Sequence, residues 1–252
     1  MNLKTCHKQG RSHSLAARVL FFLIILPAVG CLLFLSAVAA PFGFPFPEKQ
    51  KPRATVIIDA GHGGEDGGTV GVNGALEKEL NLSVAKELAG LLSEAGVEVI
   101  LTRNDDRLLY REEENIKGHR KEYDLKNRLE VAKGHPGAIF ISIHMNSFQE
   151  ARYHGLQVYY AKTEGSQCLA EAIQASVKER LQPENKRRVQ KASSSIYLLE
   201  NAVGCAVLVE CGFLSNPEEC ARLTEKDYQT QLCFSVFCGI MKYIEESSGG
   251  IP

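Results

Sequence analysis

The N-terminal stretch of the chain has no acidic residue, and most of it has no basic residue either. This absence divides the sequence into two parts. The first 18 residues contain four basic residues and no acid, and residues 19–47 contain no Asp, Glu, Lys or Arg. The remainder carries 25 basic and 30 acidic residues, a charge of -5, although the whole 252-residue chain sums to -1. A domain without a basic excess gives no electrostatic argument for nucleic-acid binding. The composition also excludes collagen-like, coiled-coil and disordered classes.

The uncharged stretch predicts export. Basic residues precede a long apolar run that ends in the small residues of positions 37–40, as in a secretory signal peptide. The run is also long enough to span a bilayer, so residues 1–40 are either a cleaved signal peptide or a signal anchor. In both cases the positive flank places the rest of the chain outside the cytoplasmic membrane, where it is secreted or membrane-anchored. Residues 41–53 are rich in proline and predict an extended linker.

Cysteine pairs with CxxC spacing are missing too, which argues against a zinc site built from thiolates. Six of the eight cysteines follow the N-terminal segment: Cys168, Cys205, Cys211, Cys220, Cys233 and Cys238. Six cysteines in an exported domain could form disulfides. A domain of roughly 200 residues buries a sufficient core without cross-links, however, so we favour buried free thiols.

Hydrophobic periodicity alternates between strands and helices from residue 54 onward. Strands are expected at Thr55–Asp59, Val97–Leu101, Ala138–Ile143, Gly155–Tyr160, Ile196–Leu199 and Ala206–Glu210, and helices at Glu77–Ala95, Asp124–Lys133, Gly165–Leu181 and Asp227–Ile244. This alternation predicts one α/β domain over residues 54–246, with a mostly parallel twisted sheet flanked by helices and a flexible tail at 247–252.

Polar residues gather where three of the predicted strands end. His62 follows the first strand, His144 follows the third, and Glu210 ends the last. The carboxyl ends of parallel strands meet at one edge of a sheet, where ligands bind. Glu77 begins a helix just after the glycine-rich loop 61–74. Two imidazoles and a carboxylate are the usual ligands of an open catalytic zinc site, and a further carboxylate would serve as the proton acceptor.

Each of these residues also has a structural explanation. His62 could be a turn residue, and His144 a core histidine. Glu77 could favour the helix N-terminus, and Glu210 could be a buried ion-pair partner. Because no compact HExxH-type motif is present, spacing alone does not decide between the structural and catalytic interpretations.

Five polar motifs follow one another in a fixed order. They are IIDAGHGGEDGG at 57–68, GALEKELNL at 74–82, LTR at 101–103, SIHMNS at 142–147 and VECGFLSN at 209–216. In this order they resemble the zinc-dependent N-acetylmuramoyl-L-alanine amidases of the Amidase_3 family, over about residues 55–244. One departure is Ala60, where the family commonly has proline, and this changes the stiffness of a turn rather than a ligand.

The resemblance implies a set of roles. One zinc ion (Zn2+) per chain would be bound by His62, Glu77 and His144, and Glu210 would be the catalytic carboxylate. The reaction would be hydrolysis of the amide between the lactyl group of N-acetylmuramic acid and L-alanine, on peptidoglycan glycan strands that carry stem peptides. Further candidates for orienting a ligand or contacting the substrate are Asp59, Arg103 and Asn146.

A closer resemblance points to a biological role. Lys117-Gly118, the helix at 124–129 and the segment 196–201 are similar to the branch of this family that acts in spore-cortex maturation, where a downstream deacetylase completes the muramic lactam. An activating lipoprotein partner and a place in the forespore intermembrane space are expectations of the same kind. The alternatives are a vegetative amidase of cell separation, a zinc peptidase acting within stem peptides and a noncatalytic wall-binding module.

The sequence leaves two interpretations for each of two charged segments. The basic stretch Lys186–Lys191 could bind carboxylates of stem peptides or a partner protein, or it could be a solvated surface. The charged residues between 103 and 121 could border the binding groove or form mobile, solvent-facing structure.

Overall fold

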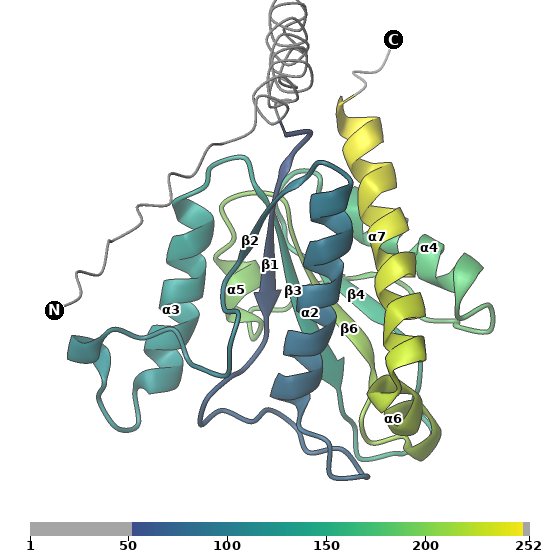
Figure 1. The fold of residues 1–252 in the computed structure, drawn as a ribbon, viewed down its shortest axis with the longest axis horizontal. Coiled ribbons are helices and arrows are strands. Elements are labelled where there is room, and N and C mark those ends of the chain that lie inside the picture. Colours follow the sequence, from purple (N-terminus) through teal and green to yellow (C-terminus); the bar gives the residue numbers. More distant parts are fainter. Residues whose placement is uncertain (1–51, 249–252) are drawn as a thin grey trace, which may run out of the picture. The chain divides into compact units, whose positions relative to one another are not determined.

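The computed structural model describes residues 52–248, and a six-stranded sheet lies at the centre of this part of the chain (Figure 1). The strand order is β2-β1-β3-β6-β4-β5. The strands are β1 (Thr55–Ala60), β2 (Glu98–Leu101), β3 (Ile139–Asn146), β4 (Gln157–Tyr160), β5 (Gln190–Lys191) and β6 (Ala206–Phe213). All neighbours pair in parallel except β4 and β6. The predicted α/β domain with a mostly parallel sheet is therefore confirmed.

Helices cover both faces of the sheet (Figure 1). The helices are α2 (Glu77–Glu94), α3 (Arg120–Lys133), α4 (Ser166–Arg180), α5 (Tyr197–Glu200), α6 (Pro217–Thr224) and α7 (Lys226–Ser248), with a short 3-10 helix at Glu112–Glu114. One core lies between the sheet and α2, α4 and α7, and a smaller one lies between the sheet and α3 and α5. Both faces of the sheet are thus buried, which is why its central strands are continuously apolar.

Successive side chains of each strand point to opposite faces of the sheet, so the position of a residue along its strand decides which of the two cores it enters. On β1, Val56 and Ile58 enter the larger core, whereas Ile57 enters the smaller one. Asp59 follows this alternation and lies on the face that carries α3 and α5. The same face carries Glu210, because Leu208, two residues earlier on β6, packs in the smaller core. The polar strand ends are therefore directed to one side of the sheet.

One predicted strand is wrong. Residues 196–199 were expected to be extended, but Tyr197–Glu200 form helix α5, with Leu198 and Leu199 buried against the sheet. A run of four apolar residues fits either a strand or one turn of helix, and only its surroundings decide between them. The strand in this region is β5, which pairs with β4 along the edge of the sheet.

The structure differs from the sequence prediction at two helices: α6 is additional, and α7 is longer. Helix α6 was not expected, although Asn216 caps it by accepting a hydrogen bond from Glu219 N at 3.0 Å and Pro217 occupies its first turn. Helix α7 runs to Ser248, beyond the Ile244 end expected from periodicity. The segment preceding residue 52, which carries the predicted signal and most of the linker, lies outside the described residues, as do residues 249–252.

All six cysteines of the described domain are free thiols, but the expectation that they are buried holds for only three of them, since Cys168 is exposed and Cys205 and Cys238 are partly exposed. Cys211, Cys220 and Cys233 are buried, and burial raises the pKa of the Cys233 thiol to about 12. Such thiols are inert, so Cys211 is not a nucleophile despite its place beside Glu210. Within residues 52–248, no helix has the length and apolar character needed to cross a bilayer.

Candidate metal centre

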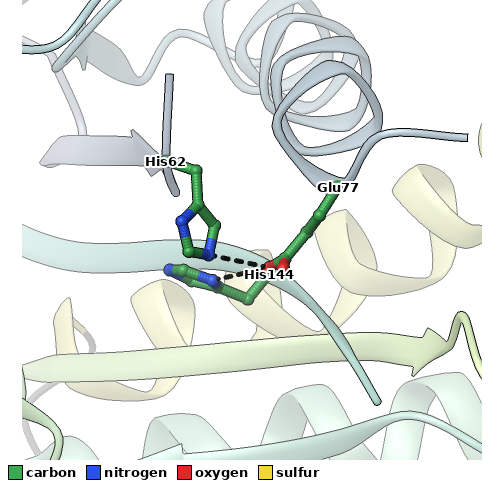
Figure 2. A group of neighbouring side chains, drawn as sticks. All are labelled: His62, Glu77 and His144. Carbon is green, nitrogen blue, oxygen red and sulfur yellow. Dashed lines mark hydrogen bonds and ion pairs between the residues drawn. The ribbon is translucent and has the colours of Figure 1, made fainter. Parts of the chain in front are cut away.

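Three side chains from three separate elements meet at the carboxyl edge of the sheet (Figure 2). His62 lies in the loop after β1, Glu77 in the first turn of α2, and His144 near the end of β3. Glu77 Oε1 lies 3.3 Å from His62 Nε2 and 2.9 Å from His144 Nδ1. One donor atom from each residue lies within 4.8 Å of the other two. The structure thus brings together the three ligands predicted from the sequence.

Glycines make this close approach feasible. A Cβ at Gly61 would lie 2.2 Å from His144 Nε2, and a Cβ at Gly68 would lie 2.6 Å from Glu77 Oε2. Gly67, in the same loop, has no atom within 4 Å of such a position. His62 itself has a φ of 60°, and it is the one non-glycine residue with positive φ in the described chain. A left-handed conformation costs free energy that the surrounding loop must offset, and such strain collects at functional sites.

Hydrogen bonds hold each ligand in position. His62 Nδ1 lies 2.9 Å from Asp66 Oδ2, which leaves Nε2 directed at Glu77. Carboxylates that orient a metal-binding imidazole in this way are common. Glu77 accepts from the backbone N–H groups of Thr69 at 2.9 Å and Met145 at 3.2 Å. Asp66 is not among the residues predicted from the sequence, because it is one of several polar residues in the glycine-rich loop.

The surroundings of Glu77 and His62 favour their charged forms. Burial opposes the ionised form of Glu77, but hydrogen bonds to His144 and His62 hold the pKa of its carboxyl well below the usual range. Burial also opposes protonation of His62, but hydrogen bonds to Asp66 and Glu77 raise its pKa to about 9. Two imidazole nitrogens and one carboxylate oxygen that converge within 4.8 Å fit the ligand set of a catalytic zinc site.

Glu210 lies beside this group. It pairs with His144 in the parallel register of β3 and β6. Its Oε2 is buried and has no hydrogen-bond partner among the described residues. Burial raises the pKa of Glu210 to about 7, an effect that the imidazoles of His144 and His62 oppose and the carboxylate of Glu77 reinforces. A carboxylate that is not held by other protein groups is free to exchange a proton with a substrate.

The remaining predicted residues lie around the ligands. Asp59 is fully buried and accepts hydrogen bonds from Thr102 Oγ1, Ser142 Oγ and Arg128 Nη1 at 2.6–2.8 Å. Arg103 is also buried, and its guanidinium donates to the carbonyl groups of Ala60, Gly61, Lys78 and Asp105 at 2.8–3.0 Å. Arg103 directly, and Asp59 through Arg128, thus hold the backbone that leads to His62. Asn146 ends β3, where its carbonyl accepts from Leu214 N at 2.8 Å.

Arg128 is the most connected residue that the sequence did not reveal. Its guanidinium, 1% exposed, donates to Asp59 and to the Ala60 carbonyl at 2.6 Å each, to the His62 carbonyl at 2.7 Å and to Asp124 at 2.8 Å. It therefore ties α3 to the loop that presents His62. Asp124 and Arg128 are four residues apart on one helix, a spacing that indicates a side-chain pair but not its burial.

The charged segment between residues 103 and 121 borders the site. Lys121 Nζ lies 3.0 Å from Asp66 Oδ2, and Arg120 Nη1 lies 2.5 Å from Glu65 Oε2. Lys78 Nζ contacts Asp106 from the other side at 2.7 Å. These pairs hold the segment against the glycine-rich loop, which agrees with a border of the groove rather than detached solvent-facing structure.

Comparison with known proteins identifies the family. The family model described as N-acetylmuramoyl-L-alanine amidase, Amidase_3, matches residues 56–242. The chain belongs to this amidase family. It is a hydrolase of that type, and the candidate metal-binding residues, Glu210 and the surrounding loops all lie within the matched residues.

Individual relatives of the chain are described as amidases too. The amidase is 36% identical over 192 residues to the germination-specific N-acetylmuramoyl-L-alanine amidase of Bacillus subtilis, covering 76% of this chain and 80% of the relative. It is also similar to the CwlD amidase of Clostridioides difficile, whose structure was solved in complex with the GerS lipoprotein, with 39% identity, a TM-score of 0.73 and coverage of 76% and 98%. The catalytic domain of CwlV, from Bacillus (Paenibacillus) polymyxa, matches with 29% identity, a TM-score of 0.63 and coverage of 76% and 98%.

Proposed function

We propose that this amidase binds one zinc ion through His62, Glu77 and His144 and uses Glu210 to cleave the amide between the lactyl group of N-acetylmuramic acid and L-alanine. The convergence of the three donor atoms within 4.8 Å carries the proposal. The family match supports the bond that is cleaved. The donor set is that of open zinc sites in hydrolases.

The residues of the chain divide the chemistry between them. Zinc, when bound, supplies Lewis-acid chemistry for the water and the amide carbonyl. Glu210 accepts the proton of the attacking water through its unpaired carboxylate oxygen. The protonated Glu210 then donates that proton to the departing amine of L-alanine. Asp66 keeps His62 Nε2 directed at the metal position throughout.

Product analysis of purified peptidoglycan tests this proposal. We expect the zinc-loaded full-length chain to release peptides that begin with free L-alanine, leaving intact lactyl groups on the glycan, and we expect a chelator to abolish the reaction. His144→Ala should lose both stoichiometric zinc and product, whereas the exposed Lys126→Met on α3 should keep both. Peptides trimmed internally would instead indicate a zinc peptidase. Glycan affinity without zinc or product would indicate a noncatalytic wall-binding module.

We further propose a role in spore-cortex maturation. The support is similarity to a relative described as germination-specific and to CwlD in complex with a lipoprotein. In this role the amidase acts outside the cytoplasmic membrane, secreted or held by its N-terminal segment, in the forespore intermembrane space. An exported lipoprotein is the proposed partner, and a deacetylase uses the peptide-free muramic acid. The alternative within the same chemistry is a vegetative amidase of cell separation.

Muropeptide analysis of spores separates these two roles. A strain that lacks the protein should form spores without muramic lactam, because the deacetylase would have no peptide-free substrate. Complementation with the wild-type chain should restore the lactam, and complementation with His144→Ala should not. Unchanged lactam content together with chained vegetative cells would assign the amidase to cell separation instead.

A further inference from the structure

The basic stretch at 186–191 holds one arginine in a fixed position. Arg187 Nε donates to the carbonyl of His154 at 2.8 Å, and Arg187 Nη1 donates to Gln157 Oε1 at 2.8 Å. The guanidinium carbon lies 4.3 Å from the centroid of the Phe213 ring, and the ring of Tyr153 lies at 5.8 Å. Stacking on an aromatic face and two hydrogen bonds leave this side chain little freedom.

The charge of Arg187 is not compensated within the domain. No carboxylate of the described residues forms an ion pair with it, and its Nη2 has no hydrogen-bond acceptor among them. The two other immobilised arginines differ, since Arg103 and Arg128 have acceptors for all three of their nitrogens. Arg187 therefore presents a preorganised and unfilled donor edge, the geometry that binds a carboxylate with two hydrogen bonds.

Gln157 connects Arg187 to the proposed catalytic carboxylate, Glu210. Gln157 on β4 and Glu210 on β6 are direct partners in the antiparallel pair, so their side chains lie on the same face of the sheet. Gln157 Oε1 is the group to which Arg187 donates, and Phe213 is three residues beyond Glu210 on the same strand. An open hollow of about 490 Å³ adjoins Arg187; its lining residues are Arg152, Tyr153, His154, Glu184, Lys186 and Arg187.

We infer that Arg187 binds a free carboxylate of the stem peptide, on the leaving-amine side of the scissile bond. The inference rests on the proposed amidase function and names the part of the substrate that this surface recognises. The N-acetylated glycan offers hydroxyl and amide groups to this hollow, whereas the peptide carries carboxylates. Because the residues after position 18 sum to -5, the average field repels an anionic peptide, and a fixed local cation is needed to hold it.

Kinetics on two matched substrates test Arg187. The first substrate is a set of soluble muropeptides with free carboxylates, and the second is the same set with the carboxylates converted to methylamides. For the zinc-loaded full-length chain, Arg187→Gln should raise KM for the free-acid substrate about 10-fold to 100-fold, the loss typical of a charge-assisted hydrogen bond, with kcat changed less than about threefold. KM for the methylamide substrate should not change, so the preference of the wild type for the acid should disappear.

Two further variants separate recognition from folding. Arg188→Gln removes the exposed neighbouring charge and should leave both KM values as in the wild type. Arg187→Lys keeps the charge but loses the planar fork, and it should give an intermediate KM for the acid. Zinc content and Tm are measured for each. Equal loss on both substrates, or the same effect from Arg188→Gln, would overturn the assignment. Failure of the wild type to cleave either substrate would instead refute the proposed amidase function.

Discussion

Replacing Glu210 by glutamine should lower kcat by about two to four orders of magnitude, the usual contribution of a general acid and base. Glutamine has nearly the same shape but cannot accept the proton of water or return it to the leaving amine. The Oε2 atom of Glu210 has no partner among the described residues, so the substitution breaks no protein hydrogen bond at that atom. Steady-state hydrolysis of muropeptides measures the effect.

Zinc content distinguishes proton transfer from metal binding. Glu210→Gln should keep one zinc per chain and a Tm close to that of the wild type, because Glu210 is outside the cluster formed by His62, Glu77 and His144. Glu200→Gln, on the exposed pair with Lys162, is the matched control and should retain full activity. If Glu210→Gln lost its zinc, Glu210 would be a ligand rather than the proton acceptor. Retention of normal kcat would remove it from the mechanism.

Replacing Arg128 by methionine should lower the free energy of unfolding by about 3–5 kcal/mol, because two acids would lose their shared buried partner. Asp59 and Asp124 lie 2.6 and 2.8 Å from the Arg128 guanidinium, and all three side chains are at most 3% exposed. For a domain of this size the change corresponds to a Tm lower by roughly 10 °C. Thermal unfolding followed by circular dichroism measures it. Lys126→Met, at an exposed ion pair on the same helix, should change Tm by less than about 2 °C.

The pH dependence of the stability of Arg128→Met provides a second test of this prediction. Burial acts to raise the pKa of Asp59, but Arg128 and the hydroxyls of Ser142 and Thr102 hold it below its usual value. In the wild type, Asp59 therefore stabilises the fold above its unfolded pKa, and this stabilisation is lost only in strong acid. Without Arg128, burial should dominate and raise the pKa of Asp59. The variant should then gain stability relative to the wild type as the pH falls from 7 to 5, and an unchanged pH profile would contradict the prediction.

The sequence predicted the sheet and the convergence of the candidate ligands for a physical reason. Strands buried on both faces are continuously apolar, so a polar residue such as His144 or Glu210 at a strand end is conspicuous. Parallel strands bring those ends to one edge, and the ordered motifs assigned a role to each. His62 and Glu77, which lie on either side of the glycine-rich loop, meet only in the folded chain, where they converge with His144 as the sequence predicted.

Residues that act through tertiary contacts were not predictable in the same way. Arg128 lies on a helix whose exposed face is also charged, and nothing in the local sequence shows that its guanidinium is buried against β1. Asp66 is one of several polar residues in its loop, and only the fold shows that it orients His62. The segment 196–199 illustrates the same limit for backbone structure, because its apolar residues pack equally well from a strand or from one helical turn.

The distance between His144 and Glu210 is set by backbone hydrogen bonding, because the two residues are partners in adjacent parallel strands. Neighbouring strands lie about 4.8 Å apart whatever side chains they carry. Substitutions can therefore repack either core, and the loops at the rim can change length, without separating His144 from Glu210. A loop substitution at the rim should therefore alter which substrates reach the site before it alters the spacing of the two side chains that the proposed hydrolysis uses.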